Sequence, residues 1–326
     1  MHDKVYKIIF TTILWVHISP EKFKNRDITS AKDFSREELE FIFDVSEEAK
    51  ENPDKFRNRL NGRIVSIIFF EPSTRTYQSF QTAAKALGCD VIGFAEPSTS
   101  SYVGKEESFH DTIKIFENYS DAIVIRHPTA GSAKFAAEIS KKPVINAGSG
   151  FQEHPTQAML DLFTIKSHFG KIDSLKIGLL GDLRYGRTVP SLCYSLSNFD
   201  VELSLIAPDT LQIRPEVESH LNQKGIQFKK KSGLDGVVND LDVLYVTRLQ
   251  KERFADPTEY KKLKGSYKVT MDTLKDAKES MIILHPLPRI DEISTDIDNT
   301  KFAKYFDQAR NGLFVRIALL NLILGR

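Results

Sequence analysis

The sequence predicts an α/β protein made of two doubly wound parallel-sheet domains, with helices on both faces of each sheet. Its 326 residues exceed the length of about 250 to 300 residues at which a single hydrophobic core usually stops growing. Hydrophobic residues make up 41% of the chain, as expected for ordinary globular folding. Short apolar segments alternate with amphipathic ones, which is typical of parallel strands joined by helices.

The first half of the chain begins with a predicted amphipathic helix over residues 34–50, where Ser35 and Glu38 form a capping-box pattern. A strand rich in β-branched and aromatic residues follows at 64–70. The other elements predicted in this half are a polar turn at 71–75, strands at 91–94, 122–125 and 144–146, and helices at 76–87, 108–118 and 132–139.

The second half shows the same alternation after a predicted helix over residues 155–168. The elements predicted there are strands at 175–180, 201–206, 243–246 and 281–284, and a helix at 187–197. The chain ends on a strongly apolar stretch, 311–324, which contains Arg316 and is predicted to form a helix buried against a larger body.

Charge and cysteine content restrict the function. Lys plus Arg number 45 and Asp plus Glu number 44, so no strong field favours nucleic acid or an anionic membrane. Cys89 and Cys193 form no CxxC pair, and no His cluster has metal-ligand spacing, so we expect a reducing compartment, the cytoplasm, and no metal.

The N-terminus carries an apolar run over residues 6–18 that includes Trp15. The run is shorter than the about 20 residues that span a bilayer. No small-x-small cleavage site follows it, which disfavours a signal peptide. An additional strand or helix, or a start codon assigned too early, is the favoured interpretation, with secretion and a targeting remnant as alternatives.

Five polar clusters follow predicted strands or open predicted helices, where ligands bind in open parallel sheets. They are STRT at 73–76, RHP at 126–128, HPTQ at 154–157, TRLQ at 247–250 and HPLPR at 285–289. In STRT, hydroxyl groups, a guanidinium and helix N-terminal N–H groups converge, and such groups hold a phosphate without a metal. STRT alone is equally compatible with a polar helix cap.

From about residue 23 to its end, the chain resembles the aspartate carbamoyltransferase catalytic chains of the aspartate/ornithine carbamoyltransferase family. The resemblance lies in the motifs FFEPSTRT, RHP, NAGSGFQEHPTQ, GDLRYGRT, TRLQKER and HPLPRIDEI, which occur in family order. It implies an enzyme that transfers the carbamoyl group of carbamoyl phosphate to the amine of L-aspartate, giving N-carbamoyl-L-aspartate and phosphate, the committed step of pyrimidine biosynthesis. It implies no cofactor.

The resemblance also implies a role for each matched residue at the carbamoyl phosphate site. The expected ligands are Ser73, Thr74, Arg75, Thr76, Arg126, His154, Gln157, Leu287 and Pro288. Arg75, Thr76, Arg126 and His154 are expected to be catalytic. Donors from Thr76, Arg126 and His154 would stabilise the charge that develops on the carbonyl oxygen, while Gln157 accepts from the amide. Leu287 and Pro288 resemble the family's cis turn.

Aspartate carries two carboxylates, so its site needs at least two fixed cations. Arg187 and Arg248 match the family's pair, assisted by Gln250 and Lys105. Arginine suits this task because its planar fork pairs bidentately with a carboxylate. In the family, the loop that holds Ser101 and Lys105 enters the site of the neighbouring subunit, which implies a homotrimer. Regulatory chains are candidate further partners.

The expected domain organisation follows the same resemblance. We expect an N-terminal extension of unknown role at 1–22, a carbamoyl phosphate-binding domain at 23–155 plus 311–326, and an aspartate-binding domain at 156–310. The last helix would then return to the first domain, with Arg316 as a structural arginine near the phosphate.

Three residues depart from the family pattern. Glu106 stands where the family usually has Gly after the loop lysine, which puts the detail of this loop in doubt. Tyr77 and Gln81 stand where the family often has Arg and Glu. Positions four apart share a helix face, so an ion pair there is replaced as a unit.

Three other functions compete with this one. The first is a P-loop-like nucleotide hydrolase, because GDLRYGRT has Walker A spacing with Arg in place of Lys. Against it, no apolar strand ends in a Mg-binding Asp, since Asp242 begins its strand. Ornithine carbamoyltransferase has HCLP in place of HPLP and lacks TRLQKER. A catalytically silent subunit is disfavoured because every matched catalytic position is filled.

Overall fold

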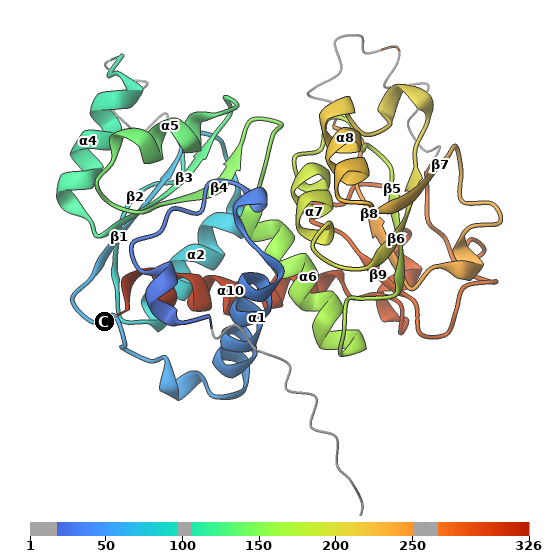
Figure 1. Cartoon of the computed structure of the whole chain (residues 1–326), viewed down its shortest axis with the longest axis horizontal. Coiled ribbons are helices and arrows are strands. Elements are labelled where there is room, and N and C mark those ends of the chain that lie inside the picture. The colour runs from blue at the N-terminus through green and yellow to red at the C-terminus, as the bar shows by residue number, and fades with distance from the viewer. Residues whose placement is uncertain (1–17, 97–105, 251–257, 259–266, 326) are drawn as a thin grey trace, which may run out of the picture.

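The structure is a computed structural model that describes residues 18–96, 106–250, 258 and 267–325, and it contains two parallel sheets side by side (Figure 1). The first sheet has the strand order β2-β1-β3-β4, and the second has the order β7-β6-β5-β8-β9. Every strand pair in both sheets is parallel. The predicted fold class is therefore confirmed.

The first sheet forms from strands that are mostly apolar, because helices cover both of its faces. Its strands are β1 (Ile64–Phe69), β2 (Asp90–Phe94), β3 (Ala122–His127) and β4 (Val144–Ser149), and its helices are α2 (Thr74–Ala86), α4 (Phe109–Tyr119) and α5 (Ser132–Ile139). The strand order reverses between β1 and β3. Ligands bind at such a switch point, outside the carboxyl ends of the strands.

The second sheet has its switch point between β5 and β8. Its strands are β5 (Leu175–Leu180), β6 (Val201–Ile206), β7 (Gln227–Lys231), β8 (Val243–Val246) and β9 (Ile282–Leu284), and its helices are α7 (Thr188–Leu196) and α8 (Pro215–Gln223). The sequence analysis predicted all of these elements except β7 and α8.

Three further helices pack against one another: α1 (Arg36–Glu51), α6 (Pro155–Phe169) and α10 (Tyr305–Leu324). In Figure 1, α10 passes beneath both halves and lies against α1, α2 and α6. The C-terminal helix thus returns to the first sheet, as predicted. The predicted capping box of α1 is also present, with the N–H of Ser35 donating to Glu38 Oε2 at 3.0 Å.

Short 3₁₀ helices complete the described chain, at Pro20–Phe23, Ala31–Asp33, Pro53–Lys55, Asp209–Leu211, Val238–Asp240 and Thr295–Asn299. Phe23 is fully buried, and the N–H of Asn25 donates to the carbonyl oxygen of Ile323 at 3.0 Å. The predicted N-terminal element with Trp15 lies outside the described residues except for Ile18.

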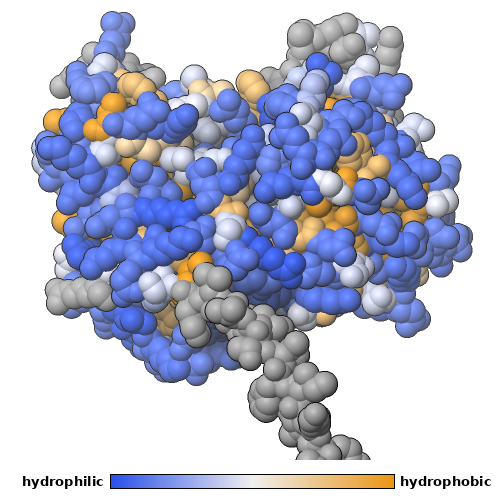
Figure 2. All heavy atoms as spheres, in the orientation of Figure 1, coloured by the Kyte–Doolittle hydropathy of each residue, from blue (hydrophilic) through white to orange (hydrophobic). Residues whose placement is uncertain are grey.

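The face shown in Figure 2 is largely hydrophilic, with apolar residues scattered over it. No helix of the described chain is long and apolar enough to cross a membrane. Within the same residues, no group of three His, Cys, Asp or Glu side chains is arranged to hold a metal ion.

Candidate active site

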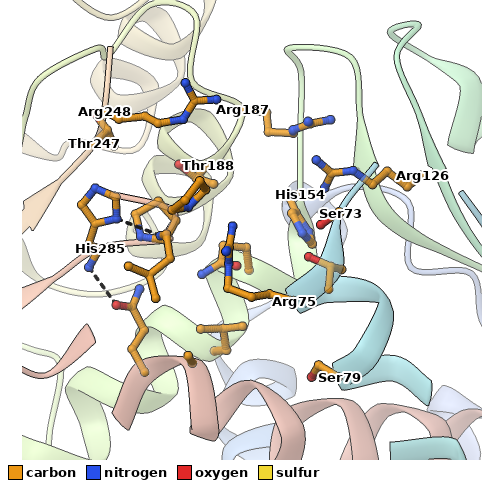
Figure 3. Close-up of a pocket in the computed structure, with 18 of the residues that line it drawn as sticks. Ser73, Arg75, Ser79, Arg126, His154, Arg187, Thr188, Thr247, Arg248 and His285 are labelled. Carbon is orange, nitrogen blue, oxygen red and sulfur yellow. Dashed lines mark hydrogen bonds between the residues drawn. The ribbon is translucent and has the colours of Figure 1, made fainter. Parts of the chain in front are cut away.

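A cavity of about 430 Å³ lies where the carboxyl ends of the two sheets face each other (Figure 3). It is lined by loops that follow β1, β3, β5, β8 and β9 and by α2, α6 and α10. The structure brings together here these residues singled out from the sequence: Ser73, Arg75, Thr76, Arg126, His154, Gln157, Arg187, Arg248, Gln250, Leu287, Pro288 and Arg316.

Three expected ligands are not among the lining residues. Thr74 is the first residue of α2, and its side chain is exposed outside the cavity. Ser101 and Lys105 lie outside the described residues. Glu106 is described, and its φ of 55° is a left-handed conformation that glycine adopts at no steric cost. This conformation gives a physical reason for a family preference for Gly at that position.

The STRT segment forms the first turn of α2, with Ser73 as the N-cap. The Ser73 side chain makes no capping hydrogen bond, so its hydroxyl is not used to satisfy the helix. Helix N-terminal N–H groups and the positive end of the helix dipole face this turn, which suits an anion. Tyr77, one of the departures, packs edge-on against Phe69 with ring centroids 5.4 Å apart, so it contributes packing there.

Arginine dominates the electrostatics of the cavity, whose lining includes five guanidinium groups. They belong to Arg75, Arg126, Arg187, Arg248 and Arg316. Burial and the neighbouring Arg248 lower the pKa of Arg75, and burial lowers that of Arg316 to about 10, so both remain charged at neutral pH. Such a cluster fits a ligand with several negative charges.

Glu71, in the turn after β1, is the acidic partner of two of these arginines. It accepts from Nη1 and Nη2 of Arg187 at 3.1 and 2.7 Å. Its Oε1 also lies 3.5 Å from Nη2 of Arg126. The carboxylate therefore connects Arg126, near the end of β3, to Arg187, which precedes α7. The sequence analysis quoted Glu71 within FFEPSTRT but assigned it no role.

Gly148, near the end of β4, provides the space for the same two guanidinium groups. A Cβ atom at this position would lie 3.1 Å from Nη1 of Arg126 and 3.1 Å from Nη1 of Arg187. Its φ of +119° is also one that other residues rarely adopt. Any side chain here would displace one arginine or both.

His154 is the N-cap of α6 and is only 4% exposed. Its backbone N–H donates to Ser191 Oγ at 2.7 Å, which fixes the residue against α7. Burial, followed by the charges of Arg126, Arg316 and Arg187, lowers the pKa of His154 well below its usual value. The ring is therefore neutral at pH 7, and its Nε2 has no hydrogen-bond partner among the described residues.

The GDLRYGRT loop is organised around Asp182, which is fully buried. Its Oδ1 accepts the N–H groups of Tyr185 and Arg184 at 2.8 and 3.2 Å, and its Oδ2 accepts the N–H of Gln250 at 3.3 Å. Two N–H groups of this loop thus bind the loop's own carboxylate. A Walker A loop instead directs such groups at a nucleotide phosphate.

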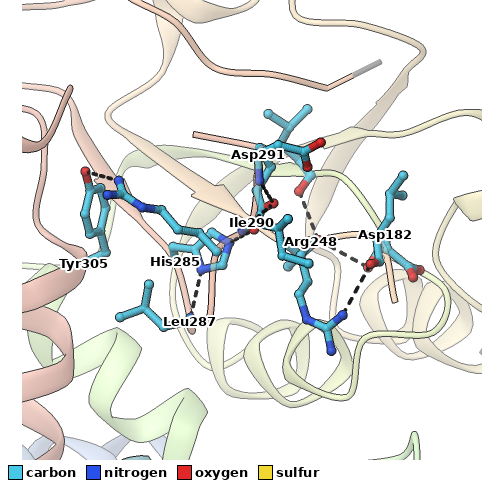
Figure 4. A network of polar contacts seen from close by, with 12 residues as sticks. Asp182, Arg248, His285, Leu287, Ile290, Asp291 and Tyr305 are labelled. Carbon is cyan, nitrogen blue, oxygen red and sulfur yellow. Dashed lines mark hydrogen bonds and ion pairs between the residues drawn. The ribbon is translucent and has the colours of Figure 1, made fainter. Parts of the chain in front are cut away.

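The HPLPR turn is held by a buried histidine (Figure 4). His285 Nδ1 accepts the N–H of Leu287 at 2.8 Å, and its Nε2 lies 2.7 Å from Glu292 Oε1. Glu292 Oε2 accepts the N–H groups of Ile290 and Asp291 at 3.1 Å each. The Leu287–Pro288 peptide bond is cis, in agreement with the family turn. The supporting role of Glu292 was not predicted.

Two family models match the chain. The carbamoyl-P binding domain of aspartate/ornithine carbamoyltransferase matches residues 26–167, and the Asp/Orn binding domain of the same family matches residues 173–323. The chain belongs to the aspartate/ornithine carbamoyltransferase family.

Individual relatives within the aspartate/ornithine carbamoyltransferase family agree with this assignment. The chain is 52% identical over 306 residues to an aspartate carbamoyltransferase catalytic subunit from Thermococcus onnurineus, covering 93% of this chain and 98% of the relative. It is 52% identical over 305 residues to the catalytic subunit from Nitrosopumilus maritimus, with the same coverage.

Solved structures of the aspartate/ornithine carbamoyltransferase family have the same fold. The catalytic subunit of M. jannaschii aspartate transcarbamoylase matches with a TM-score of 0.83 and 46% identity, over 91% of this chain and 97% of that one. The aspartate transcarbamoylase of Trypanosoma cruzi in complex with carbamoyl phosphate and aspartate matches with a TM-score of 0.88 and 39% identity, over 93% and 98%.

Proposed function

We propose that the cavity is the active site of an aspartate carbamoyltransferase, which transfers the carbamoyl group of carbamoyl phosphate to the amine of L-aspartate. The observation that carries this proposal is the meeting of five arginines with a neutral, buried His154 at the carboxyl ends of both sheets. Carbamoyl phosphate and aspartate together bring a phosphate and two carboxylates, so they need this density of fixed cations. The identity to aspartate carbamoyltransferase catalytic subunits supports the proposal.

The carbamoyl phosphate side of the site follows from α2 and the end of β3. The phosphate would bind at the N-terminus of α2, held by the Ser73 and Thr76 hydroxyls and by Arg75. Because the Thr74 side chain is exposed, its backbone N–H is the group that we assign to the phosphate. Arg126 would bridge the phosphate and the carbonyl oxygen.

The reaction needs no covalent enzyme intermediate. The unprotonated aspartate amine attacks the carbonyl carbon, the C–N bond forms, and negative charge develops on the carbonyl oxygen. The C–O bond to phosphate then breaks, and the leaving phosphate takes the proton from the amine. Thr76, Arg126 and His154 would donate to the developing oxyanion, and one such donor is often worth about 100- to 1000-fold in rate.

The aspartate side lies on the second sheet. Arg187 and Arg248 would each bind one carboxylate, with Gln250 beside them. Arg187 keeps N–H donors beyond those that Glu71 accepts, because a guanidinium has five. Ornithine carries one carboxylate and a cationic tail, and that tail would face an arginine in this cavity. The second arginine therefore favours the dicarboxylate.

The assembly proposal rests on the family resemblance. Ser101 and Lys105 would reach the site of a neighbouring chain, which requires a closed head-to-tail ring and, for this family, a homotrimer. The catalytic-subunit names of the relatives support regulatory chains as further partners. A cytoplasmic location and a role in pyrimidine synthesis complete the proposal.

The purified chain should form N-carbamoyl-L-aspartate from carbamoyl phosphate and L-aspartate, and it should use L-ornithine poorly. Arg248→Ala should lower kcat/KM for aspartate about 10- to 100-fold, corresponding to the roughly 1.5 to 3 kcal/mol of a lost charged hydrogen bond. The Kd of carbamoyl phosphate should change little. Arg184→Ala, in an exposed arginine outside the cavity, is the matched control and should behave like the wild type. A preference for ornithine would overturn the proposal.

A further inference from the structure

A buried carboxylate lies beneath the carbamoyl phosphate side of the cavity. Asp161 is on α6, one turn after Gln157, and it is 0% exposed. Residues 155–165 of α6 are all buried, so Asp161 brings a charge into an otherwise tightly packed helix. A buried carboxylate persists only where several donors satisfy it. Its partners should therefore have a defined purpose.

Three donors from three elements converge on Asp161. Its Oδ1 accepts from Gln157 Nε2 at 2.8 Å and from Gln308 Nε2, on α10, at 2.6 Å. Its Oδ2 accepts from the hydroxyl of Tyr245, on β8, at 2.9 Å. An ionised carboxylate can accept all three hydrogen bonds, because it offers about four lone-pair sites and no donor.

This arrangement determines which end of the Gln157 amide faces the cavity. A side-chain amide has a donor end and an acceptor end, and the hydrogen-bond network decides how it is turned. Asp161 only accepts, so Gln157 must point Nε2 at it, and Oε1 remains as the polar atom available to the cavity. The neighbouring Gln308 cannot turn around either, since its Oε1 accepts the N–H of His285 at 2.8 Å.

We infer that Asp161 is a positioning residue that fixes the Gln157 amide with its oxygen toward the substrate, and that this orientation selects a carbamoyl group over other acyl groups. The inference rests on the proposed function. A carbamoyl group ends in NH₂, which can donate to Oε1. An acetyl group ends in a methyl, which leaves Oε1 without a partner in a desolvated site.

Acetyl phosphate is therefore the probe, because it differs from carbamoyl phosphate only by CH₃ in place of NH₂. With L-aspartate, the two donors give N-acetyl-L-aspartate and N-carbamoyl-L-aspartate, each with release of phosphate. The measured quantity is the ratio of kcat/KM for carbamoyl phosphate to kcat/KM for acetyl phosphate. Assays at pH 8.5 keep Asp161 ionised, since burial raises its pKa to about 7.

Asp161→Leu should lower this ratio about tenfold or more. Leucine is of similar size but accepts no hydrogen bond, so Gln157 is free to turn its nitrogen toward the substrate. In a Gln157→Ala background, Asp161→Leu should leave the ratio unchanged, because the amide through which it acts is absent. If the Leu variant at 161 does not fold, Gln157→Leu tests the same step, and it must lower the ratio similarly.

Thr164→Val is the matched structural control. Thr164 Oγ1 accepts from Asn311 Nδ2 at 3.1 Å, another buried contact between α6 and α10, and neither residue lines the catalytic cavity. This variant should lose stability and keep the wild-type ratio. Equal losses of kcat/KM with carbamoyl phosphate and with acetyl phosphate in Asp161→Leu, or the same shift of the ratio in the Gln157→Ala background, would overturn this inference and leave the proposed function standing. Failure of the wild type to make N-carbamoyl-L-aspartate would instead refute the proposed function.

Discussion

Gly148 illustrates how individual residues limit the space for the site arginines. Gly148→Ala should lower kcat/KM for aspartate about tenfold or more, because the new methyl would lie 3.1 Å from both Arg126 and Arg187 and would displace them. Steady-state kinetics with each substrate varied in turn would show the loss on both the carbamoyl phosphate and the aspartate side.

Gly225→Ala is the control for backbone strain. Gly225 also has a left-handed φ, +73°, but a Cβ atom there would meet nothing within 4 Å. Both variants should lose on the order of 1 kcal/mol of stability from strain, and only Gly148→Ala should lose activity. Equal activities of the two variants would show that the arginines adjust at no cost.

Sequence reasoning identified the cations of the site better than the carboxylates that hold them. Arg126, Arg187 and Arg248 each stand in a motif directly after a strand or before a helix, so their place in the cavity follows from chain order. Glu71 pairs with Arg187, Asp182 accepts the backbone N–H of Gln250, and Glu292 pairs with His285, all from turns whose folded shape no local pattern specifies. Asp161 did leave a signal, since it is the one charge in the run PTQAMLDLFTI.

Asp161 also gives α6 a testable pH dependence. Burial raises the pKa of its carboxyl to about 7 in the folded protein, against an ordinary value of 3.8. The folded state therefore binds this proton more tightly than the unfolded state, and its stability falls as pH rises between about 4 and 7. The melting temperature of Asp161→Asn minus that of the wild type should therefore rise from pH 5 to pH 7. Above pH 8 this difference should stay nearly constant.

Asp173 has a carboxyl whose pKa is shifted in the opposite direction, so Asp173→Asn is the control for this pH dependence. Although burial raises the pKa of this carboxyl, its hydrogen bonds with Arg36 and the N–H of Asp200 lower it below the ordinary value overall. The stability that it contributes is present above about pH 4 and is lost only at lower pH. The melting-temperature difference of Asp173→Asn should stay flat from pH 5 to pH 8.5, and the same flat profile for Asp161→Asn would contradict a raised pKa.

Helix α10 contains a glycine, Gly312, whose replacement by alanine should destabilise the protein, although alanine usually stabilises a helix relative to glycine. Alanine in a helix interior is normally better than glycine by about 1 kcal/mol. At Gly312, however, a Cβ atom would lie 2.6 Å from Arg316 Nη1 and 2.9 Å from Leu160 Cδ2, because α10 presses against α6. Gly312→Ala should therefore destabilise the protein by about 1 to 3 kcal/mol in chemical denaturation. Arg310→Ala, at an exposed α10 position, should stay within about 0.5 kcal/mol of the wild type.

The elements that sequence reasoning missed are those with little apolar surface. Strand β7 reads QFKKK and is mostly exposed, because it lies at the edge of the sheet and pairs only with β6. Helix α8 buries only Val217 and Leu221. The apolar pattern also placed the start of α10 at residue 311, six residues late, because Asp307, Gln308 and Arg310 interrupt the apolar residues of its first turns. The buried strands needed no tertiary information, since their composition alone reveals them.

At the scale of the whole molecule, the proposed trimer predicts complementation between two inactive proteins. Arg75→Ala damages the phosphate pocket of its own chain, whereas Lys105→Ala would damage the site of the next chain. Each variant trimer alone should be nearly inactive. Dissociated and reassociated together, they should recover activity, at most about one site in three per hybrid trimer by the ring geometry.

Hybrid formation must be measured independently of activity, and native mass spectrometry provides this. Remixing two samples of the same variant is the control, and it should recover nothing. Hybrids that form and stay inactive would show that the loop with Lys105 does not serve a neighbouring site.

The position of α10 also has a consequence for the order in which the protein is synthesised. This helix leaves the ribosome after every other described helix and strand, yet it packs on α1 and α2, which are made much earlier. The 218 residues from 87 to 304 separate the end of α2 at Ala86 from the start of α10 at Tyr305. At about 5 to 20 residues per second, the first domain waits roughly 10 seconds or more for its last helix. During that interval its apolar underside is open to chaperones, so nascent chains should bind them until α10 has emerged.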